Sequence, residues 1–253
     1  MSESSGCALV TGGSRGIGNA IGRRLAKDGF HVVLIGRDLD ALKTEVSEIK
    51  DFGGQASLLQ VDFLSDNYTE VIAKFLSEQK LKPNILINGL GGGFGSKTFD
   101  SVEVFKKVFH LNFFVAHELM DLVFANAKSM GWGRIIFIST LAINHKSASA
   151  PYVASKAALE AYMKIVAKEL AKINENFLAC AVSPGLINVK GKFFNKLKSE
   201  DPAKLTDVLE RNSVFAGRLG EPDEVARVVS FLCDRETTYL NGCNIEIDGG
   251  ASN

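Results

Sequence analysis

The stretch that decides the fold is residues 7–29, CALVTGGSRGIGNAIGRRLAKDG. A short apolar run ends in the glycine-rich turn TGGSRGIG at 11–18. A stretch with helical spacing follows, in which Ile17, Ile21 and Leu25 share one face. Gly29 stands where a helix of this length would end, at the C′ position. The segment therefore predicts a strand, a tight turn and a helix.

The same alternation continues along the whole chain. Further apolar runs, separated by helical stretches, occur at 31–36, 56–62, 84–88, 134–139, 177–183 and 244–248. Continuous apolar strands that alternate with amphipathic helices indicate a parallel sheet covered on both faces. Since no linker or repeat interrupts the pattern, we predict a single α/β domain over 1–253. Its fold is expected to be a Rossmann-type, doubly wound parallel sheet of about seven strands.

Composition excludes several classes of function. The chain has 253 residues, 46% of them hydrophobic, and 29 basic residues balance 29 acidic ones, so nothing favours nucleic acid or an anionic membrane as a partner. The four cysteines are scattered without a C-x-x-C pattern, which favours free thiols in a reducing compartment. We expect a cytoplasmic protein without a signal peptide or membrane span. The four histidines lack ligand spacing, so no metal is predicted.

The glycine turn predicts an anion site. Glycines let the backbone turn tightly and let a pyrophosphate approach the free N–H groups of the following helix. The spacing G-x-x-x-G-x-G differs from the usual dinucleotide pattern G-x-G-x-x-G, and no Gly-Lys-Ser/Thr follows, so it is not a Walker loop. The alternative is a purely structural turn.

The end of the second predicted strand bears on the choice of cofactor. An acid there would bind the adenosine ribose of NAD, but this chain has Gly36 and then Arg37, and Arg15 lies in the glycine turn. Two guanidinium groups can bind a 2′-phosphate, so we predict NADP(H). The alternative is a surface pair between arginine and Asp38, which is also a plausible N-cap. Asp62, after the third strand, could accept the adenine amino group or cap a helix.

The segment PYVASKAALEAY at 151–162 carries candidate catalytic groups. Tyr152 and Lys156 are four residues apart, so on a helix they share one face. A nearby ammonium lowers the pKa of a phenol, and a tuned phenol can donate a proton to a carbonyl or accept one from an alcohol. Ser139, thirteen residues upstream of the tyrosine, ends a predicted strand at the sheet edge where ligands bind. Its hydroxyl is expected to hold the substrate oxygen.

Taken together, these motifs resemble the short-chain dehydrogenase/reductase family, in its single-domain branch and most closely the 3-oxoacyl-carrier-protein reductases. The resemblance covers essentially the whole chain. The segments that carry it are TGGSRGIG, the serine, tyrosine and lysine above, Asn112 in FHLNFF, SPGLI at 183–187, and the C-terminal segment 217–250.

The resemblance implies a role for each matched residue. Tyr152 is the general acid or base, Lys156 lowers its pKa and binds the nicotinamide ribose, Ser139 polarises the carbonyl, and Asn112 supports a water-linked proton relay. The cofactor-binding residues that it implies are Gly12, Ser14, Arg15, Gly16, Ile17, Gly18, Arg37, Asp62, Asn88, Gly91, Tyr152, Lys156, Pro184, Gly185 and Ile187.

Two positions depart from the family's pattern. Where the family usually has Asn-Asn-Ala-Gly after the fourth strand, this chain reads NGLGGGFG at 88–95. Val189 stands where the family often has a threonine that faces the cofactor. The region 186–216 mixes aromatic and charged residues, and we expect it to form a lid over the substrate; a plain surface helical hairpin is the alternative.

The sequence thus predicts an NADP(H)-dependent oxidoreductase that interconverts a carbonyl and a secondary alcohol, with a 3-oxoacyl thioester as one candidate substrate. A carrier-linked substrate could meet Lys190, Lys192, Lys196 and Lys198, although a solvated basic face explains these lysines as well. The alternatives are a sugar or hydroxy-acid dehydrogenase of the same family, or a cofactor-binding regulatory protein without turnover. By analogy with the family we expect a homo-oligomer, either a tetramer or a dimer, built on helices at about 101–129 and 151–173 and on the C-terminal strand.

Overall fold

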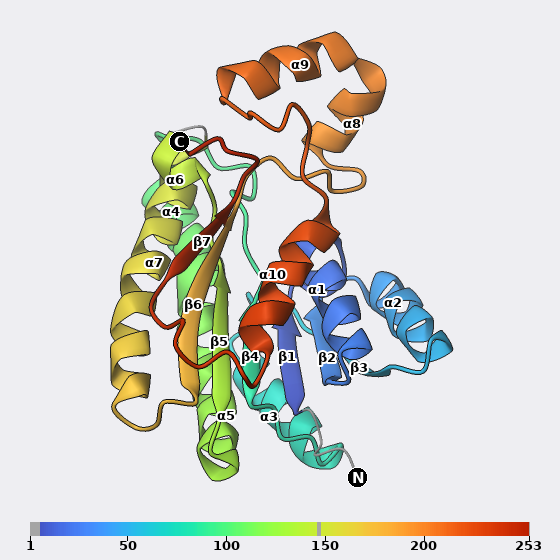
Figure 1. Ribbon diagram of the computed structural model, residues 1–253, viewed down its shortest axis with the longest axis vertical. Coiled ribbons are helices and arrows are strands. Elements are labelled where there is room, and N and C mark those ends of the chain that lie inside the picture. Colours follow the sequence, from blue (N-terminus) through green and yellow to red (C-terminus); the bar gives the residue numbers. More distant parts are fainter. Residues whose placement is uncertain (1–5, 146–147, 253) are drawn as a thin grey trace.

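The computed structural model, which describes residues 6–145 and 148–252, contains one parallel seven-stranded sheet (Figure 1). Its strand order is β3-β2-β1-β4-β5-β6-β7, so the order reverses between β1 and β4. The strands are β1 Cys7–Thr11, β2 His31–Gly36, β3 Gln55–Gln60, β4 Ile85–Asn88, β5 Gly133–Ile138, β6 Phe177–Pro184 and β7 Asn244–Ile247. The predicted doubly wound α/β fold is confirmed.

Helices cover both faces of the sheet. They are α1 Gly16–Lys27, α2 Leu39–Asp51, α3 Tyr68–Glu78, α4 Val102–Phe109, the π-helix η1 His110–Phe114, α5 Val115–Met130, α6 Ala142–His145, α7 Ala150–Ala171, α8 Phe193–Glu200, α9 Pro202–Arg211 and α10 Pro222–Cys233. Helices α3, α5 and α7 share one core with the sheet, and α1, α2 and α10 share the other. Each strand alternates its side chains between these two cores, as parallel strands must.

The local signals at the start of the chain act as predicted. Ile21 and Leu25 of α1 are fully buried. Gly29 follows the end of that helix with φ +93°, the left-handed conformation that suits glycine at C′. The Asp38 carboxylate accepts a hydrogen bond from the backbone N–H of Ala41 at 3.0 Å and so caps α2. These caps fix where the first two helices begin and end, and therefore where their ends meet the sheet.

Helices α4, η1 and α5 join into one helical stretch, Val102–Met130, of 29 residues. By length and composition alone this stretch could span a membrane, which the apolar runs of the sequence did not indicate. Most of its buried residues, Leu111 and Leu119 among them, belong to the core cluster that packs on the sheet. A helix that covers a sheet needs the same apolar character, so the hydropathy has an explanation in packing.

The predicted lid region folds as the helix pair α8 and α9, which stands apart from the main body (Figure 1). The pair has a small apolar cluster of its own, formed with residues of neighbouring loops: Leu141, Leu197, Leu205, Leu209, Val214, Leu219 and Ala251. The Asp201 carboxylate accepts from the backbone N–H of Lys204 at 3.0 Å and begins α9. The region is thus helical, as the hairpin alternative required, and whether it moves as a lid stays a prediction.

Arg134 at the start of β5 is the largest fully buried side chain. Its guanidinium donates hydrogen bonds to backbone carbonyls at the end of α10 and in the segments beside it: Leu232 at 3.0 Å, Asn176 at 2.6 Å, Asp234 at 2.8 Å and Thr237 at 2.9 Å. Burial lowers the pKa of this guanidinium. The side chain therefore fastens the C-terminal part of the chain to the centre of the sheet.

We predict that Arg134→Met lowers the free energy of unfolding by about 2–4 kcal/mol, because several buried carbonyls lose their donor. Urea denaturation followed by circular dichroism measures this change. Arg24→Met is the matched control, since Arg24 is half-exposed and pairs with Asp28 on the surface of α1, where about 0.5 kcal/mol is expected. Equal losses in the two variants would contradict the structural role of Arg134.

Candidate active site

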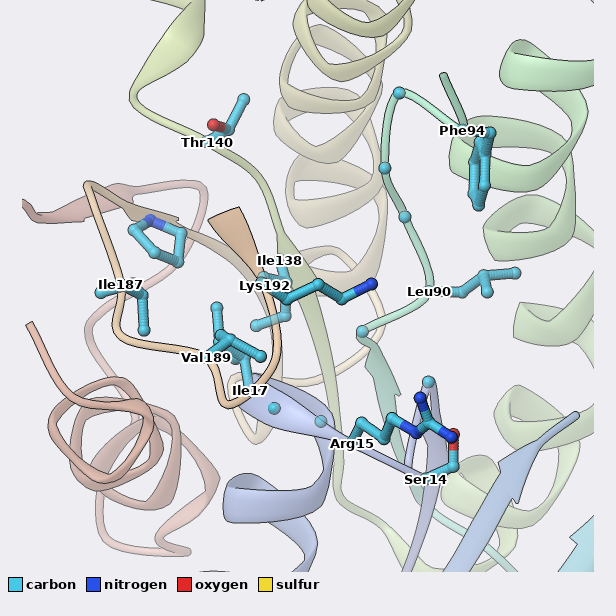
Figure 2. A pocket seen from close by; sticks show the side chains of 18 of the residues that line it. Ser14, Arg15, Ile17, Leu90, Phe94, Ile138, Thr140, Ile187, Val189 and Lys192 are labelled. Atoms are coloured by element: carbon cyan, nitrogen blue, oxygen red, sulfur yellow. The ribbon is translucent and has the colours of Figure 1, made fainter. Parts of the chain in front are cut away.

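A cleft of about 1040 Å³ lies at the carboxyl edge of the sheet (Figure 2). Its walls come from the glycine turn, the end of β2, the loop after β4, the end of β5, the start of α7 and the segment after β6. Most residues predicted to bind the cofactor line it: Gly12, Ser14, Arg15, Gly16, Ile17, Gly18, Arg37, Gly91, Tyr152, Lys156, Pro184, Gly185 and Ile187. Asp62, Asn88 and Asn112 are not among the lining residues.

The glycine turn opens α1 directly onto the cleft. A Cβ added to Gly18 would lie 2.4 Å from the carbonyl oxygen of Gly12, so only glycine lets the helix approach the end of β1 this closely. The first turn of α1 holds no acidic residue. Its free N–H groups and the positive end of the helix dipole form a cradle that fits the pyrophosphate of a dinucleotide.

Ser14, Arg15 and Arg37 gather at the end of the cleft beside β2 (Figure 2 labels the first two). The Arg15 guanidinium pairs with the Asp38 carboxylate. The pKa of Asp38 lies below its usual value because Ala41 and then Arg15 donate hydrogen bonds to it. The surface pair that the sequence left as an alternative is therefore formed, but both arginines still line the cleft. Gly36 itself carries no carboxylate, and Asp38, which lines the same end of the cleft, is paired with Arg15.

Tyr152 and Lys156 project from the first turns of α7 into the opposite part of the cleft. The Lys156 ammonium is buried and donates to the backbone carbonyl of Ile138, at the end of β5, at 2.7 Å. Burial lowers the pKa of Lys156 to about 8, and the charge of Glu160 opposes this shift. Lys156 is thus a buried amine whose charge is lost as the pH rises through about 8.

Burial acts on Tyr152 in the opposite direction. It raises the pKa of the phenol, and a hydrogen bond with the Thr140 side chain partly offsets that rise. The direct lowering by Lys156 that the sequence suggested stays a prediction. The phenol is therefore protonated at neutral pH, which suits a proton donor.

The structure corrects the role expected for Ser139. Ser139 lines the cleft, but its hydroxyl donates to Glu160 Oε1 at 2.5 Å. The hydroxyl beside Tyr152 belongs to the next residue, Thr140, which lines the cleft (Figure 2). The reason is strand alternation: Ser139 continues the row of Phe137, which packs in the core shared with α7. The alternation of the strand can be read from the sequence and indicates that Ser139 faces α7. The sequence prediction instead chose Ser139 by its distance of thirteen residues from the tyrosine.

Asn112 lies in the π-helix η1 and is fully buried. Its side-chain amide donates to Ser155 Oγ at 2.8 Å, and its Oδ1 accepts from the backbone N–H of Gly92 at 3.0 Å. A Cβ added to Gly91 would lie 2.6 Å from Lys156 Nζ, so the loop after β4 also presses on the lysine. Asn112 therefore clamps this loop to α7, while the water-linked relay expected for it stays a prediction.

Two residues assigned to the cofactor lie elsewhere. Asn88 is fully buried, and its Oδ1 accepts from Thr11 Oγ1 at 3.4 Å, so it joins the ends of β4 and β1 beneath the cleft. Asp62 accepts from the backbone N–H of Leu64 at 3.1 Å in an exposed turn, and α3 begins later, at Tyr68. Asn88 thus supports the cleft from below, and the adenine contact expected for Asp62 stays a prediction.

The two departures from the family's pattern both form part of the cleft wall. Leu90 and Phe94 of the altered loop line one side, and Lys192 and Phe194 of the lid region line the other. In Figure 2 the Lys192 side chain extends across the cleft toward Leu90. Val189 packs against the glycine turn, since a Cβ on Gly16 would lie 2.9 Å from its Cγ1. This position offers an apolar contact where the family often has a hydroxyl.

Across residues 6–145 and 148–252, no group of three or more His, Cys, Asp or Glu side chains could hold a metal ion. The chemistry available to the site's own residues is therefore proton transfer and hydrogen bonding, from the phenol of Tyr152, the amine of Lys156 and the hydroxyl of Thr140.

Known proteins share this architecture. The 7α-hydroxysteroid dehydrogenase of Escherichia coli strain K12 is 30% identical over 246 residues, covering 96% of this chain and 93% of that protein. A 7α-hydroxysteroid dehydrogenase solved with NADH and 7-oxo glycochenodeoxycholic acid matches with TM-score 0.85 and 30% identity, covering 99% of this chain and 98% of that one. L-sorbose reductase from Gluconobacter frateurii, solved with NADPH and L-sorbose, matches with TM-score 0.86 and 27% identity over 98% and 97% of the two chains.

A 3-oxoacyl (acyl-carrier-protein) reductase from Agrobacterium tumefaciens C58, solved with NADP, has the same fold, with TM-score 0.86 over 96% of this chain and 93% of that one. At 24% sequence identity, this match is evidence for a shared fold only. The family model described as short chain dehydrogenase matches residues 6–199, more than half of the sequence. Together with the tyrosine and lysine of α7 and the glycine turn of α1, this match shows that the chain belongs to the short-chain dehydrogenase family of oxidoreductases.

Proposed function

We propose that this protein is an NADP(H)-dependent oxidoreductase that interconverts a carbonyl and a secondary alcohol. The observation that carries the proposal is the arrangement along one cleft. The Tyr152 phenol, the Thr140 hydroxyl and the buried Lys156 amine lie toward one end, and Arg15 and Arg37 lie at the other. A dinucleotide on the glycine turn would extend between these two groups.

The chain's own residues supply binding and proton transfer. The nicotinamide, when bound, supplies or accepts the hydride. Tyr152 donates its phenolic proton to the carbonyl oxygen of the substrate, and Thr140 holds that oxygen by a hydrogen bond. Lys156 holds a positive charge beside the reacting centre below about pH 8. The protonated phenol acts as the general acid when the carbonyl is reduced, and the same group accepts the proton when the alcohol is oxidised.

The choice of NADP(H) rests on the arginines. Arg37 and Arg15 face the end of the cleft where the adenosine ribose would lie, and a 2′-phosphate would bind them by charge-assisted hydrogen bonds. The named relatives differ in cofactor, since the sorbose reductase was solved with NADPH and a hydroxysteroid dehydrogenase with NADH. The choice between NADP(H) and NAD(H) is therefore argued from the residues of this chain.

For the substrate we propose a small ketone with an apolar part, and a 3-oxoacyl thioester is the first candidate. Leu90, Phe94 and Phe194 line the cleft and suit an acyl chain. Lys192 on the lid region could meet an anionic carrier or phosphate. The second candidate class is a sugar or hydroxy acid, which the fold match to L-sorbose reductase supports.

Three earlier expectations stay predictions: the homo-oligomer, the cytoplasmic location and the motion of the lid. For the first, support comes from apolar side chains that remain exposed on η1 and α7, where Phe114 is 46% and Ile165 is 61% exposed. A soluble chain gains by covering such side chains in an assembly.

We predict that Tyr152→Phe lowers kcat/KM for ketone reduction about 10²–10⁴-fold, because the proton donor is lost. NADPH oxidation on a panel of acyl thioesters, sugars and steroids measures it, and NADPH binding by fluorescence is the control for an intact cleft. If wild type and variant bind NADPH but neither turns over any ketone, the cofactor-binding regulatory alternative is correct instead.

A second prediction separates the two adjacent hydroxyls. Thr140→Val removes the hydroxyl beside the phenol and is expected to lower kcat/KM about 10²-fold, as loss of a donor to a developing oxyanion does. Thr140→Ser should retain most of the activity. Ser139→Ala, whose hydroxyl contacts Glu160, should lose about fivefold or less, corresponding to one hydrogen bond of ~1 kcal/mol. A larger loss for Ser139→Ala than for Thr140→Val would reverse the assignment.

A third prediction concerns the cofactor. Arg37→Ala should raise the Kd for NADPH about 10–100-fold and leave that for NADH nearly unchanged, since a charge-assisted contact to phosphate contributes roughly 1.5–3 kcal/mol. Isothermal titration calorimetry gives both constants. Arg24→Ala, on the outer part of α1, is the matched control. An unchanged ratio of the two constants in Arg37→Ala would show that this arginine does not select the cofactor.

A further inference from the structure

Helix α7 carries a third polar side chain in the row that begins with Tyr152 and Lys156. Glu160 lies one turn beyond the lysine, so the three residues are spaced four apart on one face. The end of β5 meets this row residue by residue. The Thr140 side chain forms a hydrogen bond with Tyr152. The Ile138 carbonyl accepts a hydrogen bond from Lys156, and the Ser139 hydroxyl donates one to Glu160. The reaction proposed above uses only the first two members of the row.

One oxygen of Glu160 collects donors from three neighbouring strands. Oε1 lies 2.5 Å from Ser139 Oγ, 3.1 Å from Ser183 Oγ of β6 and 3.2 Å from Asn244 Nδ2 of β7. Ser183 Oγ also lies 2.9 Å from Asn244 Oδ1, so its single proton is shared between this oxygen and Glu160. A carboxylate held by donors from three strands has a fixed position, and it places a negative charge behind the active site.

The groups around Lys156 explain why the negative charge of Glu160 affects this lysine. On its own helix Lys156 lies one turn from Tyr152 and one turn from Glu160. From the loop after β4, a Cβ added to Gly91 would lie 2.6 Å from its Nζ and 3.3 Å from Oδ1 of the neutral Asn112 of η1. From β5 it meets the carbonyl of Ile138. Of these groups only Glu160 is a carboxylate, and its charge is the influence that opposes the effect of burial on the lysine.

We propose that Glu160 is a positioning residue for the active site: its carboxylate, fixed by the ends of three strands, keeps the ammonium of Lys156 charged and in place behind Tyr152. This inference rests on the proposed function for its catalytic consequence. The effect of Glu160 on Lys156 rests on their four-residue spacing along one face of α7 and on the charge of Glu160, which favours the charged form of the lysine.

The test removes the negative charge of Glu160 and keeps the size and shape of its side chain. Glu160→Gln retains an oxygen that can accept from the strand ends but removes the negative charge. Glu160 raises the pKa of Lys156, which is about 8, so removing its charge lowers that pKa and the ammonium is lost at lower pH. We expect the alkaline limb of the kcat/KM profile to move down by about one pH unit, with a loss of about fivefold at pH 8 and little loss at pH 6.

Two further variants separate charge from structure. Glu160→Asp keeps the charge and should return the alkaline limb toward the wild-type pH, even if its rate is lower. Glu169→Gln is the matched control, because Glu169 is an exposed residue of the same helix that pairs with Lys172, and it should leave the profile unchanged. A uniform loss at every pH in Glu160→Gln, with no shift of the limb, would overturn the proposal and leave a structural role only.

A readout without turnover keeps this test independent of the proposed function. In protein labelled with ¹³C at lysine Cε, the Lys156 signal, assigned by its loss in Lys156→Met, reports the titration directly. The midpoint should fall by about one pH unit in Glu160→Gln and stay in place in Glu169→Gln. If no ketone is ever reduced, the proposed function fails, but a shifted midpoint still supports the coupling. An unchanged midpoint overturns the coupling whatever the activity.

Discussion

The hydrogen bond from the Lys156 ammonium to the Ile138 carbonyl is the constraint on which the rest of the site depends. A buried amine needs a partner, and this contact ties α7 to the end of β5. Once the helix is fixed there, its 3.6-residue repeat places Tyr152 one turn before the lysine and Glu160 one turn after it. Gly91 completes the packing, since a Cβ at that position would collide with the ammonium. The catalytic geometry is therefore a consequence of one helix–strand contact.

The same burial has opposite consequences for the two titrating groups of the site. It raises the pKa of the Tyr152 phenol and lowers that of the Lys156 amine, because in each case the charged form is disfavoured. The phenol is thereby kept as a proton donor, while the amine is brought to about pH 8, where its charge is marginal. A fixed carboxylate nearby can therefore change the fraction of charged lysine close to neutral pH, which it would not do beside an exposed lysine with its ordinary pKa. This is why we infer that Glu160, which does not itself line the cleft but contacts the lining residue Ser139, bears on the chemistry.

Much of the fold and part of the site could be predicted from the sequence, because the signals are local. Apolar runs located every strand, the Asp38 cap and Gly29 bounded their helices, and the four-residue spacing placed Tyr152 and Lys156 together. The choice between Ser139 and Thr140 was missed because it depends on which face of β5 packs against α7. The contact of Asn88 with Thr11 was missed for a similar reason, since it joins strands far apart in sequence; a contact of Asn88 with the cofactor stays a prediction.

The lid region shows how such nonlocal contacts reach the substrate end of the cleft. Its apolar cluster is separate from the two main cores and includes Leu141, the residue directly after Thr140, and Ala251, which follows β7. Phe194 packs against this cluster and also lines the cleft. A substrate that contacts Phe194 is thus connected, through one small apolar cluster, to the loop that positions the Thr140 hydroxyl. This cluster is separate from the two sheet cores, and the Tyr152–Lys156–Glu160 row lies outside it, so the substrate end of the cleft and the row are held by different sets of contacts.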